Sequence, residues 1–402
     1  MRSDPPVFPG RIDPSERFRE RRRRARRRRR IRRLVGFAVL TGAVVALALN
    51  ARFIGGGEEP ARTQAATEAA TTAAKEAEAP SQVPDEIRGV HMTIGLASID
   101  GKLEEFIGYK RHGLNTIELD VKDENGTIGF LSPAVPLARE VGAQASRYYN
   151  ARAAAREIHR AGLYLIGRVV VFQDPTLVEA RPDLGIQNRA GGVWKTTAGA
   201  AWANPYDRRV WEYNVDVAEA AARAGFDEVM FDYVRFPTDG PLDLAVYPGR
   251  RPEPRWQTIA SFVEYATKRL KPLGVRVSAA LFGLAATREL GIGQRPRLLG
   301  KYLDTIYPMV YPSHYNSGEY DIPDPDAEPG RTVSFSLLDY RQKLEGRDAR
   351  IVPWLQDFSL GRTYALADVE QQIEAARRAG TAGFLLWNAG GVYTTAALRP
   401  AR

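Results

Sequence analysis

A short pattern recurs after residue 110: a helix ends in a small or basic residue and glycine, and an apolar strand follows at once. The clearest copies are 111–121 (RHGLNTIELDV), 160–172 (RAGLYLIGRVVVF), 223–233 (RAGFDEVMFDY) and 378–388 (RAGTAGFLLWN), with a variant at 272–283 (PLGVRVSAALFG). Glycine suits the end of a helix because it adopts the left-handed conformation without steric cost. Strands that alternate with helices in this way predict βα units and a parallel sheet.

The number of strands decides between the architectures that such units can form. Eight segments have the apolar character of buried strands. They are 89–94, 116–121, 164–172, 228–233, 275–281, 305–310, 351–355 and 383–387. A spacing of about 40 residues per unit fits a (β/α)8 TIM barrel with a few enlarged loops. The alternative is a doubly wound open sheet, but no GxGxxG turn follows the first strand and no P-loop occurs.

The chain before this domain differs in composition. Residues 1–33 hold 15 Arg and 4 acidic residues, a net charge of +11, whereas the whole chain carries +9. The basic character therefore belongs to this tail, which we predict to be disordered. Residues 34–49 carry no charge, and with their flank to Ile54 they approach the roughly 20 residues of a transmembrane helix.

We accordingly predict a membrane anchor at Leu34–Ile54, with the basic tail in the cytoplasm and the C-terminal domain outside. A cleaved signal peptide is the alternative, and the domain would then be secreted. The arginine run is explained by topology and lipid contact, so no nucleic-acid partner is expected.

Residues 55–85 are rich in Ala, Thr, Glu, Gly and Pro and predict a flexible linker. The folded domain is then 86–402. The chain has no cysteine, which excludes disulfides and thiolate sites.

The segment 226–240 (FDEVMFDYVRFPTDG) places one carboxylate, Asp232, at the end of an apolar strand. Burying an unpaired carboxylate costs on the order of several kcal/mol, so a partner is expected, and Arg235 lies three residues on. Such a pair could simply hold a loop in place. In (β/α)8 barrels, however, the active site lies at the C-terminal ends of the strands.

The other predicted strands also end in polar and aromatic residues. These are Asp120, Lys122, Arg168, Tyr311, His314, Gln356, Asp357, Trp387 and Asn388. Several carboxylates at one rim are hard to explain by stability alone because like charges repel, although Asp123 or Asp174 could cap a following helix. The loop 190–207 adds Trp194 and Trp202. Each either stacks on a sugar ring from an exposed position or packs under its own loop.

Two carboxylates flanked by aromatic side chains match the requirements of glycoside hydrolysis. We predict Asp232 as nucleophile or base and Asp357 as acid, with Asp120 as a further catalytic candidate. Arg168 and Arg235 would position the carboxylates. The remaining rim residues and the two loop tryptophans would bind sugar. The four histidines show no ligand spacing, so neither a metal nor a cofactor is predicted, with binding of a hard cation by carboxylates alone as the alternative. No Gly-x-Ser-x-Gly elbow occurs.

Several strings across 88–393 resemble the DUF4015 glycosyl hydrolase family. They are DVKDENG (120–126), RVVVFQDP (168–175), FDEVMFDYVRFP (226–237), YPMVYPSHY (307–315), PWLQDF (353–358) and LLWNAGGVY (385–393). The resemblance implies a TIM barrel with hydrolase ancestry, often anchored at the cell surface.

One departure from the family pattern concerns the fifth predicted strand. The family reads Ser-Ala-Asp-Val-Phe-Gly there, whereas Ala280 occupies the position of the carboxylate in 278–283. In α-amylase-like barrels the fifth strand supplies the acid. If this family resembles them, Asp357 or Asp120 has to substitute.

Three hypotheses follow. The first is a membrane-anchored, extracytoplasmic glycoside hydrolase acting on a cell-envelope or extracellular polysaccharide. The second is a non-catalytic carbohydrate-binding barrel that has lost its acid at Ala280. The third is a surface scaffold whose strand-end charges are purely structural.

Overall fold

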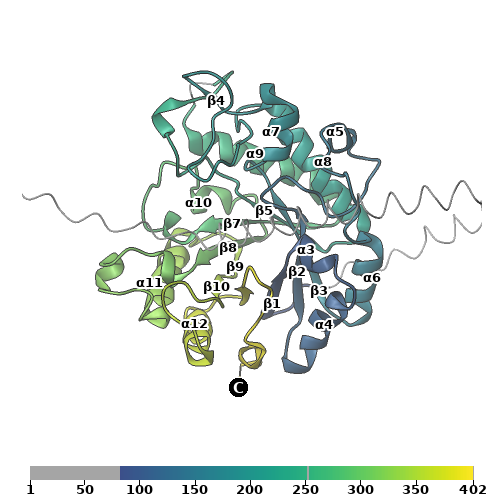
Figure 1. The fold of residues 1–402 in the computed structure, drawn as a ribbon. Coiled ribbons are helices and arrows are strands. Elements are labelled where there is room, and N and C mark those ends of the chain that lie inside the picture. Colours follow the sequence, from purple (N-terminus) through teal and green to yellow (C-terminus); the bar gives the residue numbers. More distant parts are fainter. Residues whose placement is uncertain (1–81, 251–252, 402) are drawn as a thin grey trace, which may run out of the picture. The chain divides into compact units, whose positions relative to one another are not determined.

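Eight parallel strands close into a barrel in the computed structural model, which describes residues 82–250 and 253–401 (Figure 1). The strands are β1 (Ile87–Met92), β2 (Thr116–Lys122), β3 (Tyr164–Val170), β5 (Glu228–Asp232), β7 (Arg276–Phe282), β8 (Thr305–Val310), β10 (Trp354–Gln356) and β11 (Gly383–Trp387). They pair in chain order, β11 returns to β1, and β10 pairs with both β8 and β11. The predicted (β/α)8 barrel is confirmed, and the open-sheet alternative is wrong.

The seventh predicted strand, 351–355, is divided in two. A short strand β9 (Arg350–Ile351) pairs with β8, and β10 resumes the pairing after Pro353. Proline has no N–H to give to the ladder, so the strand is interrupted at that residue. The register is kept across the break, because Ile306 faces Ile351 and Met309 faces Trp354.

Helices surround the strands (Figure 1). The α-helices are α3 (Ile94–Ala97), α4 (Lys102–Gly108), α5 (Pro136–Glu140), α6 (Ala151–Arg160), α7 (Pro175–Ala180), α8 (Arg208–Ala224), α9 (Arg255–Leu270), α10 (Pro296–Leu299), α11 (Pro329–Lys343) and α12 (Leu366–Arg378). Short 3-10 turns are η1 (Tyr109–His112), η2 (Pro182–Leu184), η3 (Leu242–Leu244), η4 (Lys271–Leu273), η5 (Gly283–Ala285), η6 (Pro312–His314), η7 (Glu319–Asp321) and η8 (Thr395–Leu398).

Helix α8 illustrates the recurring unit. The Asp207 side chain accepts a hydrogen bond from Arg209 N at 2.9 Å and caps its start. Gly225 ends it in the left-handed conformation, with φ of 103°. Strand β5 begins three residues later, as the pattern predicts.

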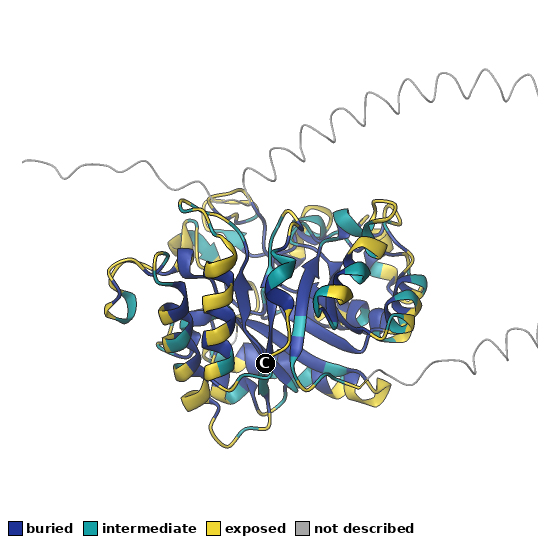
Figure 2. Ribbon diagram, turned by 90° about the horizontal axis from the view of Figure 1, so that it is seen from below, coloured by how far each residue is buried: buried dark blue, intermediate teal, exposed yellow. Residues whose placement is uncertain are grey.

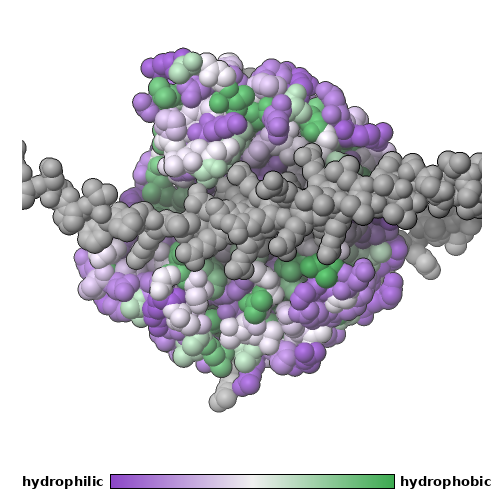
Figure 3. Space-filling view, in the orientation of Figure 1, coloured by the Kyte–Doolittle hydropathy of each residue, from purple (hydrophilic) through white to green (hydrophobic). Residues whose placement is uncertain are grey.

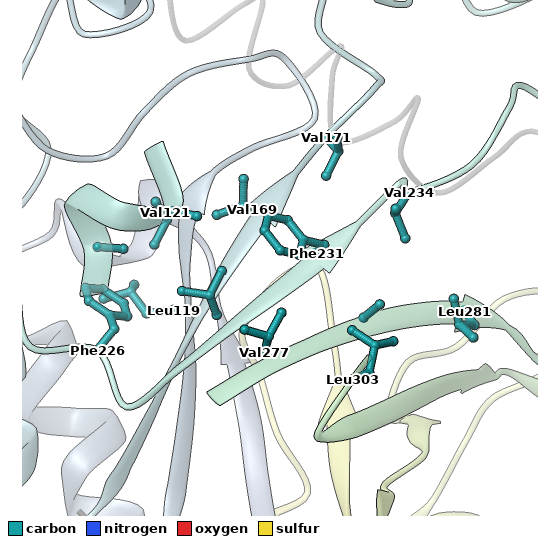
Figure 4. Packing of buried hydrophobic residues seen from close by; sticks show 14 of the residues in the cluster. Leu119, Val121, Val169, Val171, Phe226, Phe231, Val234, Val277, Leu281 and Leu303 are labelled. Atoms are coloured by element: carbon teal, nitrogen blue, oxygen red, sulfur yellow. The ribbon is translucent and has the colours of Figure 1, made fainter. Parts of the chain in front are cut away.

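Side chains alternate between the two faces of the barrel wall. Most of those that point outward are apolar and pack against one another, as Figure 4 shows for Leu119, Val169, Phe231 and Val277. In the view from below, the strands are buried and exposure is confined to the outer helical faces and the loops (Figure 2). On the face shown in Figure 3, hydrophilic residues lie mainly around the periphery, with smaller groups of hydrophobic residues between them.

The inside of the barrel is more polar than its wall. One apolar group includes Ile166, Met230 and Leu385. Toward the N-terminal strand ends, Glu228 is fully buried and accepts hydrogen bonds from the hydroxyls of Tyr164, at 3.0 Å, and Tyr307, at 2.8 Å. Charged side chains can therefore lie inside this barrel where they have partners.

Strand β2 contains a bulge that decides which of its charges face inward. Its pairing with β3 shifts between Asp120, opposite Arg168, and Lys122, opposite Val169. The extra residue, Val121, reverses the alternation. Asp120 therefore points into the barrel and Lys122 points outward to helix α8, where its Nζ contacts Asn214 Oδ1 at 2.6 Å.

No helix within 82–250 or 253–401 is long and apolar enough to cross a membrane. The predicted tail (1–33), anchor (34–54) and most of the linker (55–85) lie outside those ranges.

Candidate active site

Arg168 lies at the centre of a buried charge cluster at the C-terminal ends of three neighbouring strands. Its Nε and Nη2 donate to Asp232 Oδ2 at 2.9 and 2.6 Å, and its Nη1 donates to Asp120 Oδ1 at 2.8 Å. Nη2 also reaches Glu124 Oε1 at 2.6 Å, in the loop after β2. The guanidinium lies 5.6 Å from the ring centre of Trp354. One planar cation thus fixes the relative positions of three carboxylates.

Asp120 and Glu124, which both bind this guanidinium, differ in pKa. Burial raises the pKa of Asp120 to about 7, against the lowering influence of His91 and Arg168. Burial also acts to raise the pKa of Glu124, but the charge and hydrogen bond of Arg168 outweigh it and hold that pKa at about 2. Near neutral pH the cluster therefore contains one acid that can hold a proton beside one that cannot.

Asp232 is held by the backbone as well as by Arg168. Its Oδ1 accepts a hydrogen bond from Tyr233 N at 2.6 Å. Tyr233 has a positive φ of 50°, a conformation that a bulky residue adopts only where its surroundings enforce it. Local strain right after β5 thus accompanies a fixed carboxylate, as is frequent at functional sites.

The predicted partnership of Asp232 with Arg235 is wrong. The guanidinium of Arg235 packs on the rings of Trp202, at 4.9 Å, and Phe282, at 4.6 Å, and its Nη1 donates to Phe236 O. The sequence favoured Arg235 because it is near in the chain. Arg168 is 64 residues away but lies on the adjacent strand, where β3 and β5 pair Val170 with Asp232.

Asp357, predicted as the acid, has a different set of contacts. Thr394 binds both of its oxygens, through N to Oδ2 and Oγ1 to Oδ1, each at 2.7 Å. Burial raises its pKa, and the two Thr394 bonds oppose that effect. Asp357 and Asp232 share no hydrogen-bond partner within the described ranges. The carboxylates that share Arg168 with Asp232 are Asp120 and Glu124.

Four aromatic rings form a cluster beside the charged group, at the ends of β8, β10 and β11. Tyr311 lies 5.7 Å from Phe358 and 5.6 Å from Trp387, and Phe358 lies 5.3 Å from Trp387. His314 completes it, 5.4 Å from Tyr311. Trp387 and Phe358 are partly exposed and His314 is exposed. We call these four residues the aromatic cluster.

Three of these residues were predicted to bind substrate, and Phe358 was missed. The sequence did contain an indication for Phe358. This residue follows Asp357 directly after the seventh barrel strand, in PWLQDF, where site residues are expected.

The prediction that Trp194 and Trp202 are exposed is wrong, since both are fully buried. Trp194 donates from its indole nitrogen to Pro241 O at 2.9 Å, in the loop after β5. A small hairpin, β4 (Gln187–Asn188) with β6 (Ala245–Val246), joins the loops after β3 and β5. The burial of both rings agrees with the alternative of packing inside the protein, although Trp194 bonds to the loop after β5 as well as lying in its own loop.

Three further residues that were predicted to bind sugar form contacts within the protein instead. Lys122 is fully buried and forms an ion pair with Asp174 at 2.7 Å. Gln356 is fully buried and accepts from Ser313 N at 3.0 Å. Asn388, which is partly exposed, donates to Asp357 O and accepts from Gly390 N, so its amide shapes the turn after β11. The prediction that Lys122 and Gln356 contact sugar is wrong.

One group of described residues is close enough to be tested as a cation site. Single ligand atoms of His91, Glu118 and Asp120 lie within 4.8 Å of one another. However, Glu118 contacts Nδ1 of the imidazole, at 2.9 Å, and Asp120 lies nearest Nε2, at 3.7 Å. These two contacts use opposite sides of the imidazole ring. A hydrogen bond joins His91 to Glu118, whereas His91 and Asp120 lie at the distance of an ion pair.

Comparisons with known proteins agree with this architecture. Residues 89–393 match the family model DUF4015, described as "Putative glycosyl hydrolase domain". The structure is similar to the glycoside hydrolase domain of PgaB from Bordetella bronchiseptica, with a TM-score of 0.53, 14% identity, and coverage of 75% of this chain and 94% of that chain. This likeness supports the barrel fold.

Two weaker similarities accompany it. A hypothetical protein from Ruminiclostridium thermocellum is 30% identical over 47% of this chain and 96% of its own, with a TM-score of 0.43. A chitobiase from Flavobacterium johnsoniae is 11% identical over 78% of this chain and 47% of its own, with a TM-score of 0.48. No curated protein matches the sequence.

Proposed function

The chain belongs to the DUF4015 glycosyl hydrolase family, and from this premise we propose that it hydrolyses a polysaccharide with Asp120 as acid and Asp232 as nucleophile or base. The observation that carries the proposal is the shared guanidinium of Arg168, which holds both carboxylates at the rim of the barrel. A pair of positioned carboxyl groups, one able to donate a proton, is what glycoside hydrolysis requires.

The two carboxyl groups divide the reaction between them. Asp120, whose pKa is about 7, donates its proton to the glycosidic oxygen as the bond to the anomeric carbon breaks. Asp232 accepts hydrogen bonds from Arg168 and from Tyr233 N, which fix its rotamer. It then attacks the anomeric carbon or activates a water molecule.

The aromatic cluster supplies the binding surface for sugar. Trp387 and Phe358 combine apolar area with partial exposure, so they stack on the apolar faces of pyranose rings. Trp387 also lies 6.5 Å from the imidazole of His91, which adjoins Asp120. A sugar unit stacked on Trp387 is therefore close to the acid.

A non-catalytic carbohydrate-binding barrel is the second candidate, and Ala280 favours it. Ala280 is fully buried within the inner group of side chains. It follows Ala279, the residue opposite Phe231, and therefore lies beside Asp232. If hydrolysis in this family depends on an acid at that position, a barrel with alanine there would bind sugar without cleaving it.

We further propose an extracytoplasmic location, with Leu34–Ile54 as anchor and a cell-envelope or extracellular polysaccharide as substrate. The uncharged run after fifteen arginines supports this topology. Protease protection in right-side-out vesicles tests it: an external protease is expected to remove the C-terminal domain and leave an N-terminal tag intact.

The test of function is a hydrolysis assay of the full chain against a panel of glycans. Asp120→Asn and Asp232→Asn are each expected to abolish turnover while the proteins still bind the glycan. Glu345→Gln, at an exposed position, is the control. Binding without turnover in the unmodified protein would support the carbohydrate-binding alternative.

A further inference from the structure

A buried imidazole and a second acid adjoin Asp120 toward the N-terminal end of the barrel. His91 Nδ1 lies 2.9 Å from Glu118 Oε2, and His91 Nε2 lies 3.7 Å from Asp120 Oδ2. His91 and Asp120 are each 2% exposed and Glu118 is fully buried. His91 and Glu118 are direct neighbours in the pairing of β1 with β2. The strand register therefore builds the Glu118–His91–Asp120 chain.

The position of one proton follows from this geometry. A carboxylate only accepts hydrogen bonds, so the contact with Glu118 places a hydrogen on Nδ1. Nε2 then faces Asp120. If both lacked a proton, a nitrogen lone pair would face a negative oxygen in a buried site. The His91–Asp120 pair therefore holds one proton, on the imidazole or on the carboxyl group.

The surrounding charges favour keeping that proton. Asp120 shares Arg168 with Asp232 and Glu124, and the charge of a fourth carboxylate, Glu118, also acts on this guanidinium. Burial acts to lower the pKa of His91, but the charges of Glu118 and Asp120 outweigh it, and the pKa is raised.

Neutral groups complete the surroundings of the imidazole. The rings of Trp354 and Trp387 lie 6.1 and 6.5 Å away, and the Tyr393 hydroxyl donates to His91 O at 2.5 Å. Tyr149, Tyr233 and Tyr311 are further titratable groups that interact with the cluster, and burial raises the pKa of each. The charge of Arg235 also interacts with Asp232.

We infer that His91 and Glu118 are positioning residues that keep Asp120 supplied with the proton it donates. The inference rests on the proposed glycoside hydrolysis. Asp120 gives its proton to the glycosidic oxygen. This oxygen departs from the anomeric carbon and takes the bonding electron pair with it. The water molecule that completes hydrolysis returns one proton to the His91–Asp120 pair. Glu118 fixes the imidazole tautomer, so Nε2 faces Asp120 throughout.

The first test is a nitrogen NMR titration of the full chain labelled in its histidine rings. His91→Asn identifies the His91 signals among the four histidines. We expect hydrogen on Nδ1 and a titration midpoint above 6.5, the ordinary value. In Glu118→Gln, which keeps the size of the side chain and removes its charge, the midpoint is expected to fall by about one pH unit or more.

The control for the titration is Glu345→Gln, which is exposed and should leave the His91 midpoint unchanged. A midpoint at the ordinary value in the unmodified chain overturns the inference, as does an unchanged midpoint in Glu118→Gln. Because the titration needs no substrate, these outcomes remain decisive even if no glycan is cleaved.

The second test is the pH profile of hydrolysis. Glu118→Gln is expected to shift the loss of kcat at high pH toward lower pH, because removing a negative charge lowers the pKa of Asp120. KM should stay within about twofold. If Glu118 had a purely structural role, Glu118→Gln would lower kcat by the same factor at every pH. That result would contradict the inference.

Discussion

Asp120 and Asp232 bind the same guanidinium: Arg168 donates to Asp120 Oδ1 through Nη1 at 2.8 Å and to Asp232 Oδ2 through Nη2 at 2.6 Å. The two carboxylates come from β2 and β5, and β3 lies between them and supplies the cation. Their separation is therefore set by a rigid planar group rather than by a loop. The first prediction tests that dependence.

Replacing Arg168 with methionine is expected to destabilise the fold by about 3–5 kcal/mol, because the buried carboxylates Asp120 and Asp232 lose the guanidinium that they share. Urea unfolding at neutral pH measures this. Arg378→Met, which breaks an exposed pair with Glu374 on α12, is the control and should have little effect. Equal stability of Arg168→Met and the unmodified chain would contradict the structural role.

Stability should depend on the protonation of Asp120. Its pKa of about 7 in the folded chain lies above its ordinary value of 3.8, so the folded state binds a proton that the unfolded state has released. This contribution is complete below about pH 4 and is lost as the pH rises through 7. Asp120→Asn is expected to flatten the fall in unfolding free energy over this range. An unchanged slope would show that Asp120 is not the titrating group.

Activity should follow the same proton. The rate is expected to fall above about pH 7 as Asp120 loses its proton, whereas Glu124, with a pKa of about 2, contributes no change in the accessible range. Initial rates between pH 5 and pH 9 on the best glycan measure this. A rate that rises steadily to pH 9 would exclude Asp120 as the acid.

Sugar binding should depend on the aromatic cluster. Phe358→Ala and Trp387→Ala are each expected to weaken glycan binding about 3- to 10-fold, the loss of one stacking contact of about 0.5–1.5 kcal/mol. Calorimetric titration measures the affinity. Trp194→Phe is the matched control, because its ring is buried under a loop, so it should lower stability and leave affinity unchanged.

The buried pair of Lys122 with Asp174 should be purely structural. Lys122→Met is expected to cost about 3–5 kcal/mol, because Asp174 stays buried without its cation. At a temperature where the variant is folded, kcat and KM should match those of the unmodified chain. A selective change in KM would place Lys122 at the substrate after all.

The sequence predicted the barrel well because the helix–glycine–strand unit repeats locally. Each copy carries its own helix end and apolar strand, so no distant contact was needed to recognise it. Only the seventh strand was simplified, since Pro353 divides it.

The site was predicted less completely, because its contacts depend on register between strands. Asp232 was recognised as its centre, yet its partner came from β3 rather than from its own loop. The contact between Glu118 and His91 could not be predicted, because the sequence of one strand does not show which residue lies opposite it on the next strand. The burial of Trp194 and Trp202 was not predicted, because it accompanies contacts between the loops after β3 and β5, which lie far apart in sequence.

The bulge at Val121 has an evolutionary consequence. The charge inside this barrel is determined by the register in which β2 pairs as well as by which residues it contains. If β2 paired with β3 without the bulge, Val121 would lie opposite Val169, and the alternation would turn Lys122 inward, on the same side as Asp120, and away from Asp174. In such a strand, a shift of one residue in the pairing could convert an acidic pocket into a more basic one without replacing any amino acid.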